Sequence, residues 1–167
     1  PEAQIALGTM YQHGQGVPLD RNEAFKWYQL AEKQGYVPAK PKIYNLAKLK
    51  IPAAFKILTE DANNGAPEAQ IALGRMYQLG EGVPIDRNEA FKWYQLAEKQ
   101  GHLSATANIY ILAKFNILTA LERLKNDAQN GIVNAQIHMG NAYRYGIPSL
   151  NNYNKAGKWY HRARGQG

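Results

Sequence analysis

The residues whose spacing most resembles a catalytic arrangement are two acidic pairs, Asp20 with Glu23 and Asp86 with Glu89. Two carboxylates on either side of one bond are what glycoside hydrolysis requires, one of them acting as the acid. Each pair, however, stands at the start of a stretch with helical periodicity. An acidic N-cap followed three residues later by Glu has the form of a capping box. We therefore assign both pairs to helix capping and predict no catalytic residue.

Histidines are the other candidates for chemistry, at His13, His102, His138 and His161. A zinc site needs several ligands at short and regular spacings, and none of these histidines forms His-x-x-x-His or stands beside a second ligand at such a spacing. Cysteine is absent, which excludes disulfides, thiolate metal sites and cysteine nucleophiles. The sequence thus predicts no metal, no cofactor and no enzymatic activity, and we expect His138 to face a neighbouring helix.

Two Gly-x-Gly loops, at Gly14 and Gly16 and again at Gly80 and Gly82, could suggest a phosphate-binding loop. Such a loop needs a helix N-terminus directly after it, to which the phosphate binds. Here Pro follows instead, two residues after the second glycine. The glycines are therefore read as helix terminators, with the proline preventing the helix from resuming.

The positions of these loops reveal an internal repeat. Pro1-Glu-Ala-Gln-Ile-Ala-Leu-Gly recurs as Pro67-Glu-Ala-Gln-Ile-Ala-Leu-Gly, and the Trp-Tyr pair recurs at Trp27, Trp93 and Trp159. The period of 66 residues divides into a long repeat of 36 residues and a short one of 30 that lacks six residues of connecting loop, and the two kinds alternate. Self-similarity at such a period is typical of helical repeat arrays. We predict one array over residues 1–167, with repeats at 3–38, 39–68, 69–104, 105–134 and 135–167.

Each repeat reads as helix, turn, helix. In the third, the apolar positions follow the 3.6-residue period in both halves: Ala69, Leu73, Met76 and Tyr77, then Ala90, Trp93, Tyr94 and Ala97. A single pair of helices cannot bury its apolar face, so neighbouring pairs must stack into one core. The predicted fold class is all-α, a right-handed α-solenoid of about five antiparallel helix pairs.

These positions carry a family pattern. Ala-x3-Leu-Gly-x2-Tyr-x2-Gly-x-Gly-Val, followed by Asp-x3-Ala-x2-Trp-Tyr-x2-Ala and Gln-Gly, stands almost whole at 3–35 and 69–101 and resembles the Sel1-like repeat. The tetratricopeptide repeat is the nearest rival, but the Gly-x-Gly-Val loop favours Sel1. The resemblance implies a non-catalytic scaffold or adaptor, since members of the family serve bacterial envelope, secretion, signalling and host-interaction systems, and membrane-protein quality control in eukaryotes.

Some repeats depart from the pattern. Tyr44 and Tyr110 in the short repeats stand where it has Gly, and Ala47 and Ala113 where it has Tyr. We interpret this as an exchange of bulk between adjacent positions that conserves core volume. In the last repeat the loop at 147–150 lacks the second glycine.

The resemblance to tetratricopeptide geometry also implies which positions of each first helix line a concave surface. Among them, one row is polar and becomes cationic along the chain, and the row beside it is largely apolar. The predicted partner-binding residues are Gln12, His13, Asn45, Lys48, Leu49, Arg75, Gln78, Leu79, Ile111, Lys114, Phe115, Asn141, Arg144 and Tyr145. Such a surface suits an acidic amphipathic helix or tail of another protein. Packing of the apolar row against the next repeat is the open alternative.

Charge and composition limit the other functions. The net charge is +7, and the excess lies mainly in the last repeat, which contains no acidic residue. Without a nucleic-acid-binding motif this is read as a solvated basic end, so nucleic acid is not predicted as a partner. No apolar run approaches the ~20 residues that a membrane span needs. The chain opens inside a repeat without an initiator Met, so we expect a fragment of a longer chain and assign no compartment. An inhibitor or immunity protein that blocks a toxin enzyme is the alternative function, and self-association through the array ends is also plausible.

Overall fold

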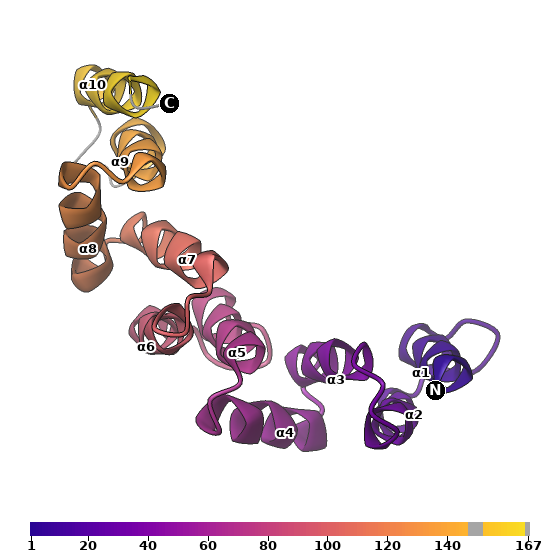
Figure 1. Ribbon diagram of the computed structural model, residues 1–167. Coiled ribbons are helices and arrows are strands. Elements are labelled where there is room, and N and C mark those ends of the chain that lie inside the picture. The colour runs from indigo at the N-terminus through magenta and orange to yellow at the C-terminus, as the bar shows by residue number, and fades with distance from the viewer. Residues whose placement is uncertain (147–151, 166–167) are drawn as a thin grey trace. The chain divides into compact units, whose positions relative to one another are not determined.

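The computed structural model describes residues 1–146 and 152–165, and these residues form ten α-helices and no strand (Figure 1). The prediction of an all-α fold is confirmed. The departure from the repeat pattern at 147–150 lies outside the described residues.

Each predicted repeat contains two of the helices. They are α1 (Glu2–His13), α2 (Arg21–Lys33), α3 (Ala39–Lys48), α4 (Pro52–Asn63), α5 (Pro67–Leu79), α6 (Arg87–Glu98), α7 (Leu103–Ala113), α8 (Leu118–Gln129), α9 (Val133–Tyr145) and α10 (Tyr153–Arg164). The chain forms two compact units, Pro1–Asp86 and Arg87–Gly167, and each is described by itself. The division into one array of five repeats stays a prediction.

Packing within each compact unit follows the order of the helices. In the first unit each helix from α1 to α4 packs on the next one, and in the second unit each helix from α6 to α9 does the same. The first helices of successive repeats also touch, α3 with α5 and α7 with α9. This is the nearest-neighbour packing expected of stacked helix pairs.

Helix boundaries agree with the predicted caps. Asp20 Oδ1 accepts hydrogen bonds from the backbone N–H groups of Asn22 at 2.9 Å and Glu23 at 3.0 Å, so this carboxylate caps α2. Asn152 caps α10 in the same way through Lys155 N at 2.9 Å. Gly14 ends α1 in the left-handed conformation, with φ of 69°. The capping role predicted for Asp20 is therefore confirmed.

A buried tyrosine fixes the close approach of the two helices in the first repeat. Tyr28 on α2 is fully buried, and a Cβ added to Gly8 of α1 would lie 2.4 Å from its Cε1 atom. The Tyr28 hydroxyl donates to Gln12 Oε1 at 2.7 Å. Gly140 and the half-buried Tyr160 repeat the close approach in the second compact unit, where an added Cβ would overlap the Tyr160 ring. The glycine of the pattern is required because the ring occupies the space of a side chain.

The short repeats place the ring on the other helix. Tyr44 stands on α3 at the glycine position, and the fully buried Leu58 takes the place of the tyrosine on α4. The Tyr44 hydroxyl donates to Asp61 Oδ2 at 2.8 Å. The exchange of bulk thus runs across the helix pair as well as between adjacent positions of α3.

We expect Gly8→Ala to lower the free energy of unfolding by about 1–3 kcal/mol, because the new methyl group overlaps the Tyr28 ring. Adding Tyr28→Leu should recover part of this loss, since a leucine stands opposite the bulky residue in the short repeats. Gly157→Ala in α10 is the control: nothing lies within 4 Å of its added Cβ, so it should show only the helix-propensity gain of about 1 kcal/mol. Urea unfolding followed by circular dichroism measures all three, and a gain in stability for Gly8→Ala would contradict the packing argument.

Candidate functional site

Two adjoining pockets lie over α3 and α5 in the first compact unit. The larger has a volume of about 520 Å³ and the smaller of about 220 Å³, and both are lined by Pro41, Tyr44 and Glu68. We call them together the α3/α5 groove. Its lining consists of Glu32, Gly35, Tyr36, Val37, Lys40, Pro41, Tyr44, Asn45, Lys48, Asp61, Ala66, Glu68, Ile71, Ala72 and Arg75.

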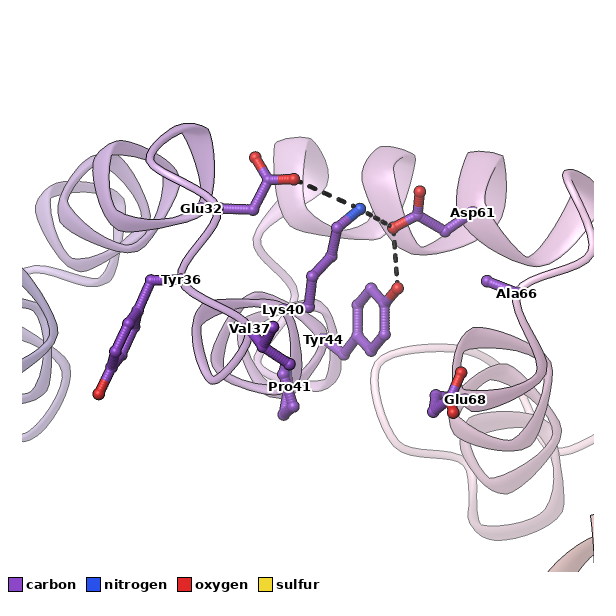
Figure 2. A pocket seen from close by; sticks show the side chains of 10 residues that line it. Glu32, Tyr36, Val37, Lys40, Pro41, Tyr44, Asp61, Ala66 and Glu68 are labelled. Atoms are coloured by element: carbon purple, nitrogen blue, oxygen red, sulfur yellow. Dashed lines mark hydrogen bonds and ion pairs between the residues drawn. The ribbon is translucent and has the colours of Figure 1, made fainter. Parts of the chain in front are cut away.

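The larger pocket has a polar cluster along one wall. Lys40 Nζ lies 2.6 Å from Asp61 Oδ2 and 3.5 Å from Glu32 Oε1, and Figure 2 shows the ammonium group between these two carboxylates. Partial burial lowers the pKa of Lys40, but the hydrogen bond to Asp61 and the charges of both carboxylates outweigh it, and the pKa is raised. Burial and the bond to Asp61 raise the pKa of Tyr44. Lys40 is thus held as a cation and Tyr44 as a neutral phenol.

Apolar side chains form the rest of this pocket. Val37 is 80% exposed, Pro41 is also exposed, and Tyr36 is half-buried (Figure 2). An exposed valine beside a proline and an aromatic ring forms apolar surface. Covering this surface with a ligand removes it from water and is therefore favourable. The larger pocket can therefore take an aliphatic chain that ends in a polar group.

The smaller pocket brings together three of the predicted partner-binding residues, Asn45, Lys48 and Arg75. Lys48 Nζ lies 3.3 Å from Glu81 Oε2, so its charge is partly compensated. Arg75 is exposed, and it makes no ion pair within the described part of the chain. The smaller pocket is thus the basic end of the groove.

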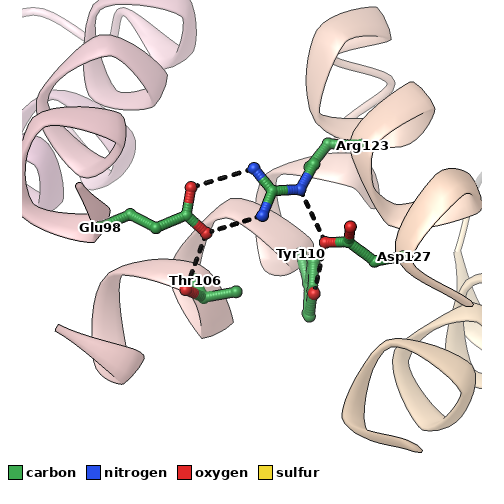
Figure 3. Close-up of polar contacts among 5 residues, drawn as sticks. All are labelled: Glu98, Thr106, Tyr110, Arg123 and Asp127. Atoms are coloured by element: carbon green, nitrogen blue, oxygen red, sulfur yellow. Dashed lines mark hydrogen bonds and ion pairs between the residues drawn. The ribbon is translucent and has the colours of Figure 1, made fainter. Parts of the chain in front are cut away.

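A related polar cluster lies in the second compact unit (Figure 3). The Tyr110 hydroxyl and Arg123 Nε both donate to Asp127 Oδ2, each at 2.7 Å. The other guanidinium nitrogens of Arg123 donate to Glu98 at 3.1 and 3.3 Å. Thr106 Oγ1 also donates to Glu98, at 2.8 Å. The five residues join α6, α7 and α8 through a polar network.

The two polar clusters take their cation from different helices, the first from α3 and the second from α8. Thr106 of α7 stands where α3 has Lys40, and Arg123 of α8 stands where α4 has Ile57. Sequence reasoning missed both clusters. The available signal was an Asp in each short repeat, Asp61 and Asp127, where the long repeats have Ala at the aligned position.

The remaining predicted residues of the first compact unit differ in exposure. Gln12 is only 7% exposed, and its amide already bonds Tyr28 and, at 3.2 Å, Asn45. Gln78 is similarly buried. His13, Leu49 and Leu79 are exposed at the ends of their helices. The two glutamines are therefore too buried to form part of a binding surface.

Two aromatic side chains among the predicted partner-binding residues of the second compact unit are exposed, each against an arginine. The Arg87 guanidinium lies 4.1 Å from the Phe115 ring centre, and that of Arg144 lies 4.8 Å from the Tyr145 ring centre. Phe115 is 46% exposed and Tyr145 is 68% exposed. Such cation–π pairs keep an aromatic face oriented while part of it stays open to a ligand.

Three other predicted residues of this unit, and one histidine, are partly buried or bonded to a neighbouring side chain. Ile111 and Lys114 are half-buried, and Asn141 accepts a hydrogen bond from the Tyr160 hydroxyl at 2.8 Å. His138 lies with its ring centre 5.5 Å from that of Tyr110, as expected for a histidine that faces a neighbouring helix. Burial, followed by the charge of Lys114, lowers the pKa of His138.

The described residues contain no group of three or more His, Cys, Asp and Glu side chains arranged to hold a metal ion. Nor is any helix among them both long and apolar enough to cross a bilayer.

The Sel1 repeat matches residues 1–36, 67–102 and 133–167, which together make up more than half of the chain. This chain belongs to the Sel1 repeat family. The matched segments are the long repeats, and they lie where the sequence pattern predicted them. Sel1 repeats are a protein-interaction fold, and proteins that contain them bind other proteins.

Relatives and solved structures agree with this assignment. The chain is 32% identical over 122 residues to an exopolysaccharide production negative regulator of Rhizobium leguminosarum bv. viciae, covering 61% of this chain and 46% of the regulator. A Sel1 repeat protein from Oxalobacter formigenes superimposes with a TM-score of 0.52 at 31% identity, over 100% of this chain and 52% of that one. A protective antigen of uropathogenic Escherichia coli strains, which displays an SLR fold, gives 0.53 at 25% identity over 98% and 38%. The Sel1 chain spans about half the length, or less, of these three proteins.

Proposed function

We propose that this Sel1 chain is a non-catalytic interaction scaffold, an adaptor that binds a segment of a partner protein in the α3/α5 groove. The observation that carries the proposal is the groove itself. It brings Asn45, Lys48 and Arg75, three residues of the predicted concave surface, into one pocket that adjoins exposed apolar surface.

The two parts of the groove favour binding in different ways. The apolar wall at Tyr36, Val37 and Pro41 offers surface that a partner can cover, and buried apolar anchors supply most of the affinity in interfaces of this kind. The cations Lys48 and Arg75 attract an acidic group and accelerate encounter. An amphipathic segment with an acidic residue at the basic end fits both parts.

Phe115, Arg144 and Tyr145 are exposed side chains near the ends of α7 and α9, two helices that touch, and we treat them as one candidate surface of the second compact unit. We propose it as an additional contact surface for a partner protein. The relative from Rhizobium leguminosarum is named as a negative regulator of exopolysaccharide production. An adaptor role for the present chain is consistent with that name.

The test is affinity capture from extracts and culture fluid of the source organism, with the bound proteins identified by mass spectrometry. The groove variant carries Val37→Asp and Arg75→Glu. The matched control carries Leu30→Asp and Lys56→Glu, one apolar and one cationic exposed residue that do not line the groove. A third variant, Lys114→Glu with Phe115→Ala and Arg144→Glu, tests the second surface.

We expect a protein that is enriched by the native chain and the control and lost from the groove variant. Capture of the same proteins by the native chain and the groove variant would show that the groove is not the binding site. If the captured protein is lost only from the third variant, the binding site lies in the second compact unit instead.

A further inference from the structure

The α3/α5 groove is electrically polarised along α5. Glu68 stands at the start of this helix and Arg75 two turns later, and both side chains are exposed. Seven residues of α-helix span about 10 Å. Glu68 lines both pockets, whereas Arg75 lines only the smaller one. The groove therefore has an acidic end and a basic end at a fixed separation.

Most other charges of the lining are compensated within the protein. Glu32 and Asp61 both pair with Lys40, and Lys48 pairs with Glu81. Glu68 and Arg75 make no ion pair within the described residues. These two side chains are consequently the charges that a ligand in the groove has to match.

The shape of the acidic end indicates which group fits there. The pocket beside Glu68 has a volume of about 520 Å³ and the apolar wall formed by Val37 and Pro41. Long basic side chains bury their methylene groups along apolar surface and keep the charged end in a polar environment. A lysine or arginine side chain fits this combination better than a short or an acidic one.

We infer that the groove selects a partner segment that carries a basic side chain for the Glu68 end and an acidic side chain for the Arg75 end, about 10 Å apart. In a helical segment the two residues are seven positions apart, and in an extended segment about three. The inference rests on the proposed function and specifies the partner's chemistry: a bipolar segment rather than a uniformly acidic one.

The second compact unit supplies a comparison from the same sequence. Asn134 and Asn141 of α9 stand where α5 has Glu68 and Arg75, so the corresponding helix surface carries no charge at either place. The polarity is thus specific to the first unit. Asn134→Lys combined with Lys125→Glu, at two exposed residues of this unit, makes a control that introduces a lysine and a glutamate outside the groove.

The experiment is selection from a displayed library of random twelve-residue peptides against four purified full-length proteins. They are the native chain, Glu68→Lys, Arg75→Glu and the control Asn134→Lys with Lys125→Glu. We expect the native chain and the control to enrich peptides with a base and an acid at one of the two spacings. Glu68→Lys should lose the base and Arg75→Glu should lose the acid, and each should weaken a peptide selected by the native chain by about tenfold or more, because like charges then meet.

Three results would overturn the inference: enriched peptides without the two charges, a motif that neither reversal changes, or a library that yields no binder. Self-association of the native chain that Arg75→Glu abolishes would also overturn it, since a second copy would then occupy the groove. The proposed function is separate from these outcomes. It fails if the proteins captured by the native chain are captured equally by the groove variant, whatever charges the selected peptides carry.

Discussion

Gly82→Ala is expected to lower the free energy of unfolding by about 2–5 kcal/mol. Gly82 has a φ of 78°, which costs a residue with a side chain about 1–2 kcal/mol. An added Cβ would also lie 2.8 Å from the Ala47 carbonyl oxygen and 3.0 Å from that of Lys48. These are backbone atoms at the end of α3 and cannot turn away, so overpacking adds about 1–3 kcal/mol.

Gly16→Ala separates the two contributions. Gly16 stands at the same place in the first repeat and has a φ of 74°, but the nearest atom to its added Cβ is the flexible Met10 Cε at 3.5 Å. We expect a loss of about 1–2 kcal/mol there, from the backbone conformation alone. Urea unfolding measures both variants, and amide exchange at the end of α3 should accelerate only in Gly82→Ala. Equal losses would show that the contact with α3 contributes nothing.

The same contact explains why the second glycine of the pattern is needed at Gly82. The loop that follows α5 crosses the end of α3, the first helix of the preceding repeat, where the carbonyl oxygens of Ala47 and Lys48 leave no room for a Cβ. Spacing indicates that the glycine stops a helix, but it does not show which backbone atoms the loop approaches.

Asp127→Ala is expected to lower the free energy of unfolding by about 2–4 kcal/mol. The side chain of Asp127 is 8% exposed and accepts hydrogen bonds from the Tyr110 hydroxyl and from Arg123. Its removal leaves a buried hydroxyl without this acceptor and an arginine with Glu98 as its remaining acidic partner. Leaving buried polar groups unsatisfied costs more than the net contribution of the hydrogen bond itself.

Asp61→Ala in the first compact unit is the matched control. Asp61 also accepts from a tyrosine and a cation, but its side chain is 22% exposed, and Lys40 keeps Glu32 as a second partner. Water can replace more of what is lost, so we expect about 1–2 kcal/mol. Thermal or urea unfolding compares the two variants. A larger loss for Asp61→Ala than for Asp127→Ala would contradict the argument from burial.

The helices and their caps could be predicted because they depend on local sequence. The 3.6-residue period placed Ala69, Leu73 and Met76 on the buried face of α5, and all three are fully buried. The capping role of Asp20 followed from its position directly before a periodic segment. Local patterns of this kind are repeated in every long repeat, which makes them more reliable than any single occurrence.

The polar contacts between helices could not be predicted, because they depend on which side chains meet across a helix pair. Gln12 belongs by position to the concave row, yet it turns inward to accept the Tyr28 hydroxyl. Gln70 and Gln136 donate their buried amides to carbonyl groups at the ends of α4 and α8, a role that the repeat pattern does not disclose. Assigning such partners requires the distances between helices.

Candidate site residues were predicted only as far as their position on a helix allowed. Counting from the start of each repeat gave Asn45, Lys48 and Arg75, and these meet in one pocket. The larger pocket was missed because Tyr36 and Val37 precede α3 and Pro41 lies near its start. Glu68, which also lines this pocket, lies on α5. The lining is therefore drawn from several elements, and no single helix face contains all of it.

The most direct test of the proposed function is hydrogen–deuterium exchange of the full chain, alone and with the partner that the native chain captures. Binding in the α3/α5 groove predicts slower amide exchange in α3 and α5, and this protection should be absent when Arg75→Glu replaces the native chain. Protection confined to helices outside the groove, or equal protection in the native chain and the variant, would contradict the assignment of the groove as the binding site.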